Sequence, residues 1–595
     1  MSEYVRITQT FGLGKCIPCG RVRVRVRGAV QWARRDVTTA PSAHHTRENS
    51  QDFGMITTSY NNPDQVLIMS TAVENFAVGG EARVNGSQHN GSTQLNGSAR
   101  PNGSAQHNGL AQLNGTAQFN GSGQLNGSAQ HNGTARRSLW DAQFLPPPLV
   151  LEDRARALKI QTRLAGLVLC GQALVRVGET FARELERGLC DLPSSLQMEN
   201  TYVPELPDGT EEGVFLALDL GGTNFRVLLL QLAAGQLVRE RVRQYHISDA
   251  LRSGPGEDLF GFLADCVQDF LRGEGMEEQE LSLGFTFSFP MRQHSISSGE
   301  LLTWTKSFCC GGMAGRDVAA MLQHCLHERG LRVRVQVLLN DTTGTLVAGA
   351  HRDPDVGIGV IMGTGSNGCY VERAERVQHW EAGRRRARDV VVDVEWGAFG
   401  DNGCLDFLRT DYDAEVDERS LLTASFTFEK YIGGKYLGEL LGVVLGALAR
   451  DGLFPAAPAP SALTTAHLSV FEEENCAGAW RETADTLEAA CGAHVTRADA
   501  LVAQHVARVI SNRAAQLVSV CVAWLLRRMA RERVAVAVDG SVYKRHPRIQ
   551  HLMNKYVALL APEHPFTLLG AEDGSGKGSA LTAAIAARVA ARHLP

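Results

Sequence analysis

Two glycine-rich turns, about 140 residues apart, carry the residue types that can hold phosphate. They are Asp219-Leu-Gly-Gly-Thr-Asn-Phe-Arg226 and Gly363-Thr-Gly-Ser-Asn-Gly368. Backbone N–H groups in such turns bind phosphate oxygens, and glycine lets the phosphate come close to the backbone. Each turn lies between two strand-like runs, so each is also explained as a β-hairpin turn without any ligand. Two similar turns in one chain indicate a nucleotide whose phosphates are held from two sides.

Two better-known phosphate motifs are matched only in part. The second turn fits the dinucleotide pattern Gly-x-Gly-x-x-Gly, but a strand-like Cys369-Tyr-Val371 follows it where that motif requires a helix. Near the C-terminus, Asp573–Gly578 imitates a Walker loop, but Lys577 is followed by glycine in place of serine or threonine. We therefore predict neither a Rossmann site nor a P-loop.

Strand-like and helical patterns alternate in the chain that follows Pro146–Pro148. Val214–Leu220 is a nearly continuous apolar run bounded by glycines, which predicts a buried strand. Further strands are predicted at Phe225–Leu230, Leu283–Phe289, Val333–Leu339 and Ile358–Met362. Helical spacing covers residues 150–188 and, in the longest stretch, Leu501–Met529. The pattern predicts an α/β protein with two lobes.

Length and composition exclude several classes of protein. With 595 residues the chain is too long for one compact domain. The net charge is −5, which argues against nucleic acid as a partner, and no apolar run reaches the roughly 18 to 20 residues of a membrane span. Thirteen cysteines, an odd number, favour reduced thiols in a cytosolic protein over a disulfide framework.

The N-terminal part differs from the rest in composition. An Asn-Gly pair recurs every six residues from Asn90 to Asn132. Because such a repeat has little to bury, we predict that residues 1–140 form a disordered low-complexity tail. Arginine alternates with valine over Arg21–Arg27, a period that does not suit a mitochondrial targeting helix. The pair Cys16 and Cys19 has no second pair nearby to complete a zinc site.

Several longer segments resemble the hexokinase family. They are the two turns, Leu283-Gly-Phe-Thr-Phe-Ser-Phe-Pro290, Trp304-Thr-Lys306 and Glu395-Trp-Gly-Ala-Phe-Gly-Asp401. The similarity covers about residues 150–590 in order, as a single kinase unit. It implies an α/β, two-lobed actin-like ATPase (ribonuclease H-like) fold with a deep interlobe cleft. Residues 141–346 would hold the N-terminal region with the small lobe, and residues 347–595 the large lobe.

The resemblance also implies an activity, which is the ATP-dependent phosphorylation of a hexose, first of all D-glucose, at its 6-hydroxyl. This is the first step of glycolysis, and its cofactors are ATP and Mg²⁺. Asp341 would be the catalytic base, and Lys306 would stabilise the transferring charge. Amides and carboxylates each pair with several hydroxyl groups, as a sugar requires. The implied sugar-binding residues are Ser288, Thr305, Lys306, Asn340, Asp341, Asn367, Glu395 and Glu429.

The implied nucleotide-binding residues lie in the two turns and in Val538–Lys544. They are Asp219, Gly221, Gly222, Thr223, Asn224, Arg226, Gly363, Thr364, Gly365, Ser366, Gly540 and Ser541. Asp219 would hold Mg²⁺ through water. Taken without the resemblance, Glu395 and Glu429 are isolated enough to be ordinary surface carboxylates.

Several positions depart from the family pattern. Met291, Ser307 and Gly368 replace its usual residues, and Phe426 stands where many relatives have a glutamine near the sugar. The arginine-rich stretch 384–388 is expected to be solvated surface.

Two other functions remain open. One is a catalytically weak glucose sensor or scaffold, which loss of Asp341, Lys306 or Thr364 would have favoured, but all three are present. The other is an interaction role for the Asn-Gly tail, which is compatible with catalysis. We expect a cytoplasmic protein that binds a hexose and Mg-ATP, without nucleic acid or integral membrane contact. The sequence does not indicate an oligomeric state.

Overall fold

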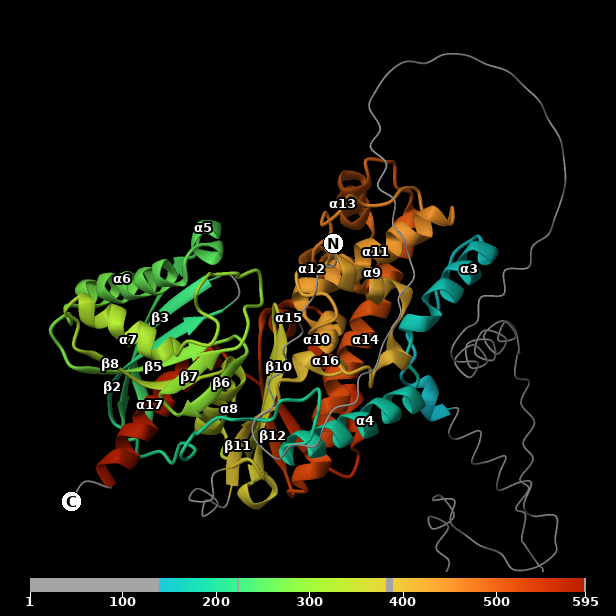
Figure 1. The fold of residues 1–595 in the computed structure, drawn as a ribbon. Helices are drawn as coiled ribbons and strands as arrows, with labels where there is room; N and C mark the ends of the chain where they lie inside the picture. Colours follow the sequence, from blue (N-terminus) through green and yellow to red (C-terminus); the bar gives the residue numbers. More distant parts are fainter. Residues whose placement is uncertain (1–138, 222–223, 381–388, 593–595) are drawn as a thin grey trace, which may run out of the picture. The chain divides into compact units, whose positions relative to one another are not determined.

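The computed structural model describes residues 139–221, 224–380 and 389–592, which belong to one compact unit within Tyr60–Pro595. Residues 1–138 of the predicted disordered tail and the arginine-rich stretch 384–388 lie outside the described residues. Leu139 and Trp140, which the prediction included in the tail, are described and helical. Two sheets organise the described chain (Figure 1). The first has six strands, in the order β1 (Glu199–Asn200), β11 (Asp389–Asp393), β10 (Ser366–Arg373), β9 (Val356–Met362), β12 (Val534–Asp539) and β13 (Phe566–Gly570).

The second sheet has five strands, with β2 near its centre. Their order is β4 (Gln236–His246), β3 (Asn224–Ala233), β2 (Gly213–Leu220), β5 (Leu281–Phe287) and β8 (Val333–Leu339). Alternate residues of β2 enter two different cores, Leu216 and Leu218 on one face and Phe215 and Ala217 on the other. The nearly continuous apolar run at 214–220 is thus the signature of a strand covered on both faces.

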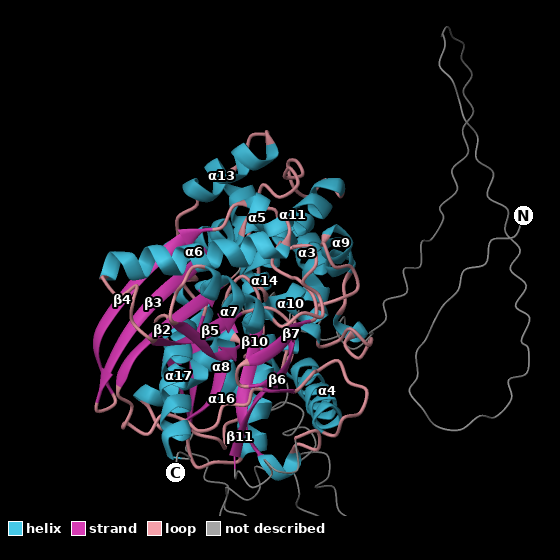
Figure 2. Ribbon diagram, turned by 60° about the vertical axis from the view of Figure 1, so that its left-hand side comes forward, coloured by secondary structure: helices cyan, strands magenta, loops and turns pink. Residues whose placement is uncertain are grey.

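Each face of this second sheet is covered by helices. On one face lie α6 (Gly256–Glu274) and α7 (Val318–Glu328), and Figure 2 shows α6 running across the strands. The other face is covered by the last helix, α17 (Gly574–Arg592), which packs on β2 and β5.

Helix α8 (Asp341–Arg352) connects the two sheets, because it packs against α17 and also against β9, β10 and β12. The two helices meet at Gly344 and Gly578, where a side chain on Gly578 would overlap the backbone of Gly344. The mutual approach of α8 and α17 therefore depends on these glycines.

A group of helices is built around α14 (Arg497–Met529), the longest helix of the described chain, which contacts β10 of the six-stranded sheet. The helices that pack against α14 are α4 (Gly171–Leu189), α11 (Gly434–Arg450), α12 (Thr465–Ala477), α13 (Arg481–Cys491) and α16 (Ile549–Leu560). Two segments, Arg154–Leu189 and Arg497–Met529, are long and apolar enough to cross a membrane by length and composition. In α14, however, 94% of the apolar window is buried inside the protein, so this helix serves the core.

Shorter elements complete the described chain. They are α3 (Arg154–Leu164), α5 (Asp249–Ser253), α9 (Asp411–Arg419), α10 (Thr427–Ile432), α15 (Ser541–Arg545) and the two-stranded sheet of β6 (Met291–Ser295) and β7 (Ser298–Leu301).

The predicted strands and the two predicted helical regions are present, with ends shifted by a few residues. Both glycine turns join antiparallel strands, β2 to β3 and β9 to β10, so the two predicted hairpins are confirmed. The predicted boundary between residues 346 and 347 separates sequence segments that pack on one another across it. Helix α17, from the C-terminal part, covers the sheet built from residues 213–339, whereas α4, from the N-terminal part, packs on α14.

Candidate active site

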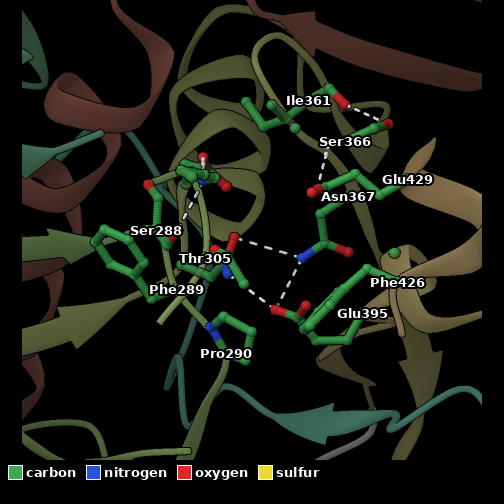
Figure 3. Close-up of a pocket in the computed structure, with 15 residues that line it drawn as sticks. Ser288, Phe289, Pro290, Thr305, Ile361, Ser366, Asn367, Glu395, Phe426 and Glu429 are labelled. Carbon is green, nitrogen blue, oxygen red and sulfur yellow. Dashed lines mark hydrogen bonds and ion pairs between the residues drawn. The ribbon is translucent and has the colours of Figure 1, made fainter. Parts of the chain in front are cut away.

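A pocket lies between residues that follow the strands of the two sheets (Figure 3). Every predicted sugar-binding residue lines it. The complete lining is Ser288, Phe289, Pro290, Thr305, Lys306, Asn340, Asp341, Ile361, Gly365, Ser366, Asn367, Glu395, Gly397, Phe426 and Glu429. A concave pocket with several converging polar groups is typical of a small-molecule site.

Asn340 and Asp341 stand where β8 ends and α8 begins. The side-chain oxygen of Asn340 accepts a hydrogen bond of 3.0 Å from the backbone N–H of Thr342, so Asn340 is the N-cap of α8. Asp341 is the first residue of the helix. Its carboxylate therefore lies at the positive end of the helix dipole, which favours a negative charge there.

Asp341 faces Lys306 across the pocket. Nζ of Lys306 lies 3.7 Å from Oδ2 of Asp341 and donates a hydrogen bond of 2.7 Å to the carbonyl of Ser288. Burial raises the pKa of Asp341, and the charge of Lys306 opposes this rise. A carboxylate of raised pKa that is held beside an ammonium group suits a general base.

Lys306 and Ser307 both have left-handed backbone, with φ of 54° and 73°. Ser307 stands where the family pattern has glycine, the residue that adopts this conformation most easily. The chain therefore accepts local backbone strain beside Lys306.

Two amides and one carboxylate form the polar wall of the pocket. The side-chain amides of Asn340 and Asn367 each donate a hydrogen bond of 3.0 Å to Oε1 of Glu395 (Figure 3). Burial raises the pKa of Glu395, and the neighbouring Asp393 raises it further. Glu395 is therefore part of a buried network and not the surface carboxylate that its sequence position alone would allow.

Glu429 and Phe426 come from the start of α10. The backbone N–H of Ser366 donates to Oε2 of Glu429 at 3.2 Å, and burial raises the pKa of Glu429. The carboxylate of Asp401 accepts hydrogen bonds of 2.9 Å from the N–H groups of Phe426 and Thr427, which fixes the start of the helix. Phe426 thus places an apolar ring in the pocket wall.

The second glycine turn lies beside this pocket. A side chain on Gly365 would overlap Oε2 of Glu429, so the present position of this carboxylate depends on the glycine. The carbonyl of Thr364 accepts a hydrogen bond of 2.9 Å from the N–H of Lys435. A Cβ atom on Gly363 would lie 3.5 Å from Cα of Gly540 and 3.7 Å from N of Ser541. The structure therefore brings together the predicted second turn and the predicted adenosine-side segment.

The first turn is tied to the last helix. The guanidinium group of Arg226 forms ion pairs with Asp219 and with Asp573, and the hydroxyl of Ser575 donates to Oδ2 of Asp219 at 2.9 Å. Arg226, predicted as a phosphate-side residue, is thus engaged by two carboxylates. Gly221 lies in the turn and Asn224 begins β3, whereas Gly222 and Thr223 lie outside the described residues.

Two aspartates of the site were not predicted. Asp393, at the end of β11, accepts hydrogen bonds from the amide of Asn367 at 2.8 Å and from the hydroxyl of Thr342 at 3.2 Å. Asp539 accepts from the backbone N–H groups of Gly540 and Gly574, at 2.5 and 2.8 Å. Asp539 lies inside the quoted segment Val538–Lys544, and Asp393 lies two residues before the motif that begins at Glu395. In the described part of the chain, no group of three or more His, Cys, Asp or Glu side chains converges enough to hold a metal ion directly.

Comparison with known proteins places this site in a family. Two family models, both described as hexokinase, match residues 159–351 and 357–585. Human Hexokinase-2 is 39% identical over 458 residues, which are 74% of this chain and 49% of the human protein. Hexokinase of Brugia malayi is 37% identical over 456 residues, 73% of this chain and 79% of that protein.

A solved structure agrees with these matches. Hexokinase from Schistosoma mansoni complexed with glucose is 36% identical, with a TM-score of 0.67, and the match covers 73% of this chain and all of the other. The chain spans about half the length of the mammalian relatives that it matches.

Proposed function

This chain belongs to the hexokinase family and has its two-lobed α/β fold, as the sequence motifs predicted, and on that premise we propose that it transfers the γ-phosphoryl group of ATP to the 6-hydroxyl of a hexose. The observation that carries the proposal is the pairing of Asp341 with Lys306 inside a pocket lined by all the predicted sugar-binding residues. D-glucose is the first hexose to test, because the Schistosoma relative is complexed with glucose.

The polar wall of the pocket supports a polyhydroxylated ligand. The amides of Asn340 and Asn367 and the carboxylates of Glu395 and Glu429 offer donors and acceptors around one space. A ligand that lacks one hydroxyl would leave a buried partner unpaired, which costs binding energy. The ring of Phe426 adds an apolar surface where a sugar C–H face can pack.

The reacting hydroxyl would lie between Asp341 and Lys306. Asp341 takes the proton of the 6-hydroxyl as the phosphoryl group transfers, and Lys306 stabilises the charge that develops. Closure of the two lobes over the sugar excludes water, which would otherwise accept the phosphoryl group.

The nucleotide phosphates would be held by the two glycine turns, with Gly363–Ser366 on one side and Gly221 on the other. Gly540 and Ser541, next to Gly363, would contact the adenosine. The carboxylate of Asp219 is a hard oxygen donor that suits Mg²⁺, and its bonds to Arg226 and Ser575 favour a contact through water. Mg²⁺, when bound with ATP, would supply neutralisation of phosphate charge.

A coupled assay of glucose 6-phosphate formation tests the proposal, with Asp341→Ala as the key variant. We expect kcat to fall by about two orders of magnitude or more, because a general base is lost, with a much smaller change in glucose affinity. Asp485→Ala, at an exposed position of α13, is the matched control and should behave as wild type. Near-normal turnover of Asp341→Ala would refute the assignment of the base. A wild-type chain that binds glucose in calorimetry without turnover would point to the sensor alternative.

A further inference from the structure

A second cavity adjoins the sugar pocket and is strongly acidic. It shares Asn340 and Glu395 with the sugar pocket and adds Glu199, Asn200, Thr343 and Asp393 to its lining. Oδ1 of Asn200 and Oγ1 of Thr343 are buried and have no hydrogen-bond partner in the described part of the chain. The cavity therefore brings three carboxyl groups together with two polar atoms that are available to water or to a protonated carboxyl group.

Asp393 connects this cavity to one amide of the sugar pocket, that of Asn367. Its Oδ1 accepts from the amide of Asn367 at 2.8 Å and from the hydroxyl of Thr342 at 3.2 Å. The same hydroxyl, which has one hydrogen to donate, also lies 3.0 Å from Oδ1 of Asn340, so the two oxygens compete for it. Asp393 is only 4% exposed, so its hydrogen bond with Asn367 is shielded from bulk solvent.

The charges around Asp393 come from several elements. Asp341 on α8, Glu199 on β1 and Glu395 after β11 are like charges, and the thiol of Cys369 on β10 is its register neighbour. The nearby cations lower the pKa values of the other carboxyl groups. Lys306 lowers those of Asp341 and Glu395, and Arg292 and His294 of β6 lower that of Glu199.

These surroundings raise the pKa values of two carboxyl groups of the cavity toward neutral pH. Burial raises the pKa of Asp393 to about 7, and the charges of Asp341 and Glu199 add to the rise. Burial also raises the pKa of Glu199 to about 7, against the opposing charges of Arg292 and His294. Both carboxyl groups therefore change protonation in the range where the protein would work.

We propose that Asp393 is a positioning residue for the hexose, which holds the amide of Asn367 for sugar binding only while it carries a negative charge. The inference rests on the proposed function, because it concerns the same pocket. An ionised acceptor binds an amide N–H more strongly than a neutral one does, so protonation of Asp393 loosens Asn367. Hexose affinity then falls as the pH drops through the pKa of Asp393.

Calorimetric titration of the full chain with glucose between pH 5.5 and 8.5 tests this inference. For the wild type we expect affinity to fall about three- to tenfold from pH 8 to pH 6, with proton release on binding near pH 7. Proton release is read by repeating the titration in buffers of different ionisation enthalpy. Because the pKa values of Asp341, Glu395 and Glu429 in the same pocket are also raised, these effects are assigned to Asp393 by comparison with a variant that cannot titrate at this position.

Two variants separate charge from shape. Asp393→Asn keeps an oxygen acceptor but cannot titrate, and it removes a charge that raises the pKa of Glu395. The fall in affinity toward pH 6 and the proton release should therefore be clearly smaller than in the wild type. Glu199→Gln removes a like charge near Asp393, so the loss of affinity should shift to lower pH. Asp393→Leu, which removes the acceptor, should weaken binding about tenfold or more, with a larger effect on KM than on kcat.

Wild-type pH dependence in Asp393→Asn, or wild-type affinity in Asp393→Leu, would overturn the inference. If Asp393→Leu does not fold, Asp393→Asn, which keeps the shape, still decides. Failure of the proposed function is read separately: glucose binding without phosphorylation removes the function and leaves the inference intact, whereas a wild type that binds no hexose overturns both.

Discussion

Lys306 and Asp341 form a charge pair whose electrostatics predict how kcat depends on pH. Burial raises the pKa of Asp341 above its usual value, and Lys306 opposes the rise. A protonated carboxyl group cannot accept the proton of the hydroxyl, so kcat should fall as the pH drops through this raised pKa. The measurement is kcat at saturating glucose and Mg-ATP from pH 5 to pH 9.

A substitution at Lys306 tests the cause of this fall in kcat at low pH. Lys306→Met removes the charge that lowers the pKa of Asp341, so kcat should begin to fall at a higher pH than in the wild type, in addition to being lower at every pH. If the fall occurs at the same pH as in the wild type, or at a lower pH, another group controls it.

Residue types and motifs predicted the members of the sugar pocket but not the contacts behind them. Ser288, Asn367 and Glu395 were found because they stand in long motifs. Asp393 was missed because one acidic residue at the end of an ordinary strand gives no signal in a single sequence. The ion pair between Arg226 and Asp573 was also missed, because it joins residues 347 positions apart and sequence spacing does not report such contacts.

The hairpin of β9 and β10 positions its turn against α10, and this contact predicts the effect of adding one methyl group. In Gly365→Ala the new Cβ would overlap Oε2 of Glu429, so the carboxylate of Glu429 must shift from its position in the sugar pocket. We expect KM for glucose to rise by about tenfold or more, since small displacements of binding groups are costly.

The control for this substitution is Gly442→Ala in α11, where an added Cβ meets nothing within 4 Å. That variant should keep the wild-type KM and gain up to about 1 kcal/mol in free energy of unfolding, because alanine is the better helix former. Equal KM values for the two variants would contradict the proposed contact of Glu429 with the sugar.

Helix α14 is joined to α9 by a buried ion pair, which predicts a large effect on stability. Arg513 is 1% exposed, and its two terminal nitrogens lie 2.7 and 2.9 Å from the two carboxylate oxygens of Asp413. Arg513→Met leaves a buried, unpaired carboxylate, so the free energy of unfolding should fall by about 3–5 kcal/mol. Denaturant unfolding measures this loss.

Two further variants check the origin of that loss. Arg419→Met, which removes a half-exposed ion pair with Glu415, should cost no more than about 1 kcal/mol. The double variant Arg513→Met/Asp413→Leu should recover part of the stability lost in Arg513→Met. If it recovers none, the unpaired charge of Asp413 is not the cause.

The positions of strands could be predicted from the sequence better than the elements that pack against them. The continuous apolar runs located β2 and β9 to within a few residues, because strands that are buried on both faces have few polar positions. No local pattern indicated that α17 packs on β2 and β5, since this pairing joins the end of the chain to strands that begin near residue 213.

The catalytic unit, taken as a whole, should function without the first 138 residues. All described site residues follow position 139, so removal of residues 1–138 should leave kcat, KM and the melting temperature unchanged. A loss of activity in this truncated chain would mean that the Asn-Gly tail takes part in catalysis or folding.

A slightly longer truncation, of residues 1–150, is the informative control, because the segment it also removes is anchored in the core. Phe144 is fully buried and stacks on Tyr556, with ring centroids 5.7 Å apart, and its carbonyl accepts a hydrogen bond of 2.7 Å from Gln516. Trp140 covers Gly171 at the start of α4. Loss of one such buried aromatic side chain costs about 3–5 kcal/mol. The melting temperature should therefore drop sharply between the two truncations, and equal melting temperatures would show that the folded unit begins after residue 150.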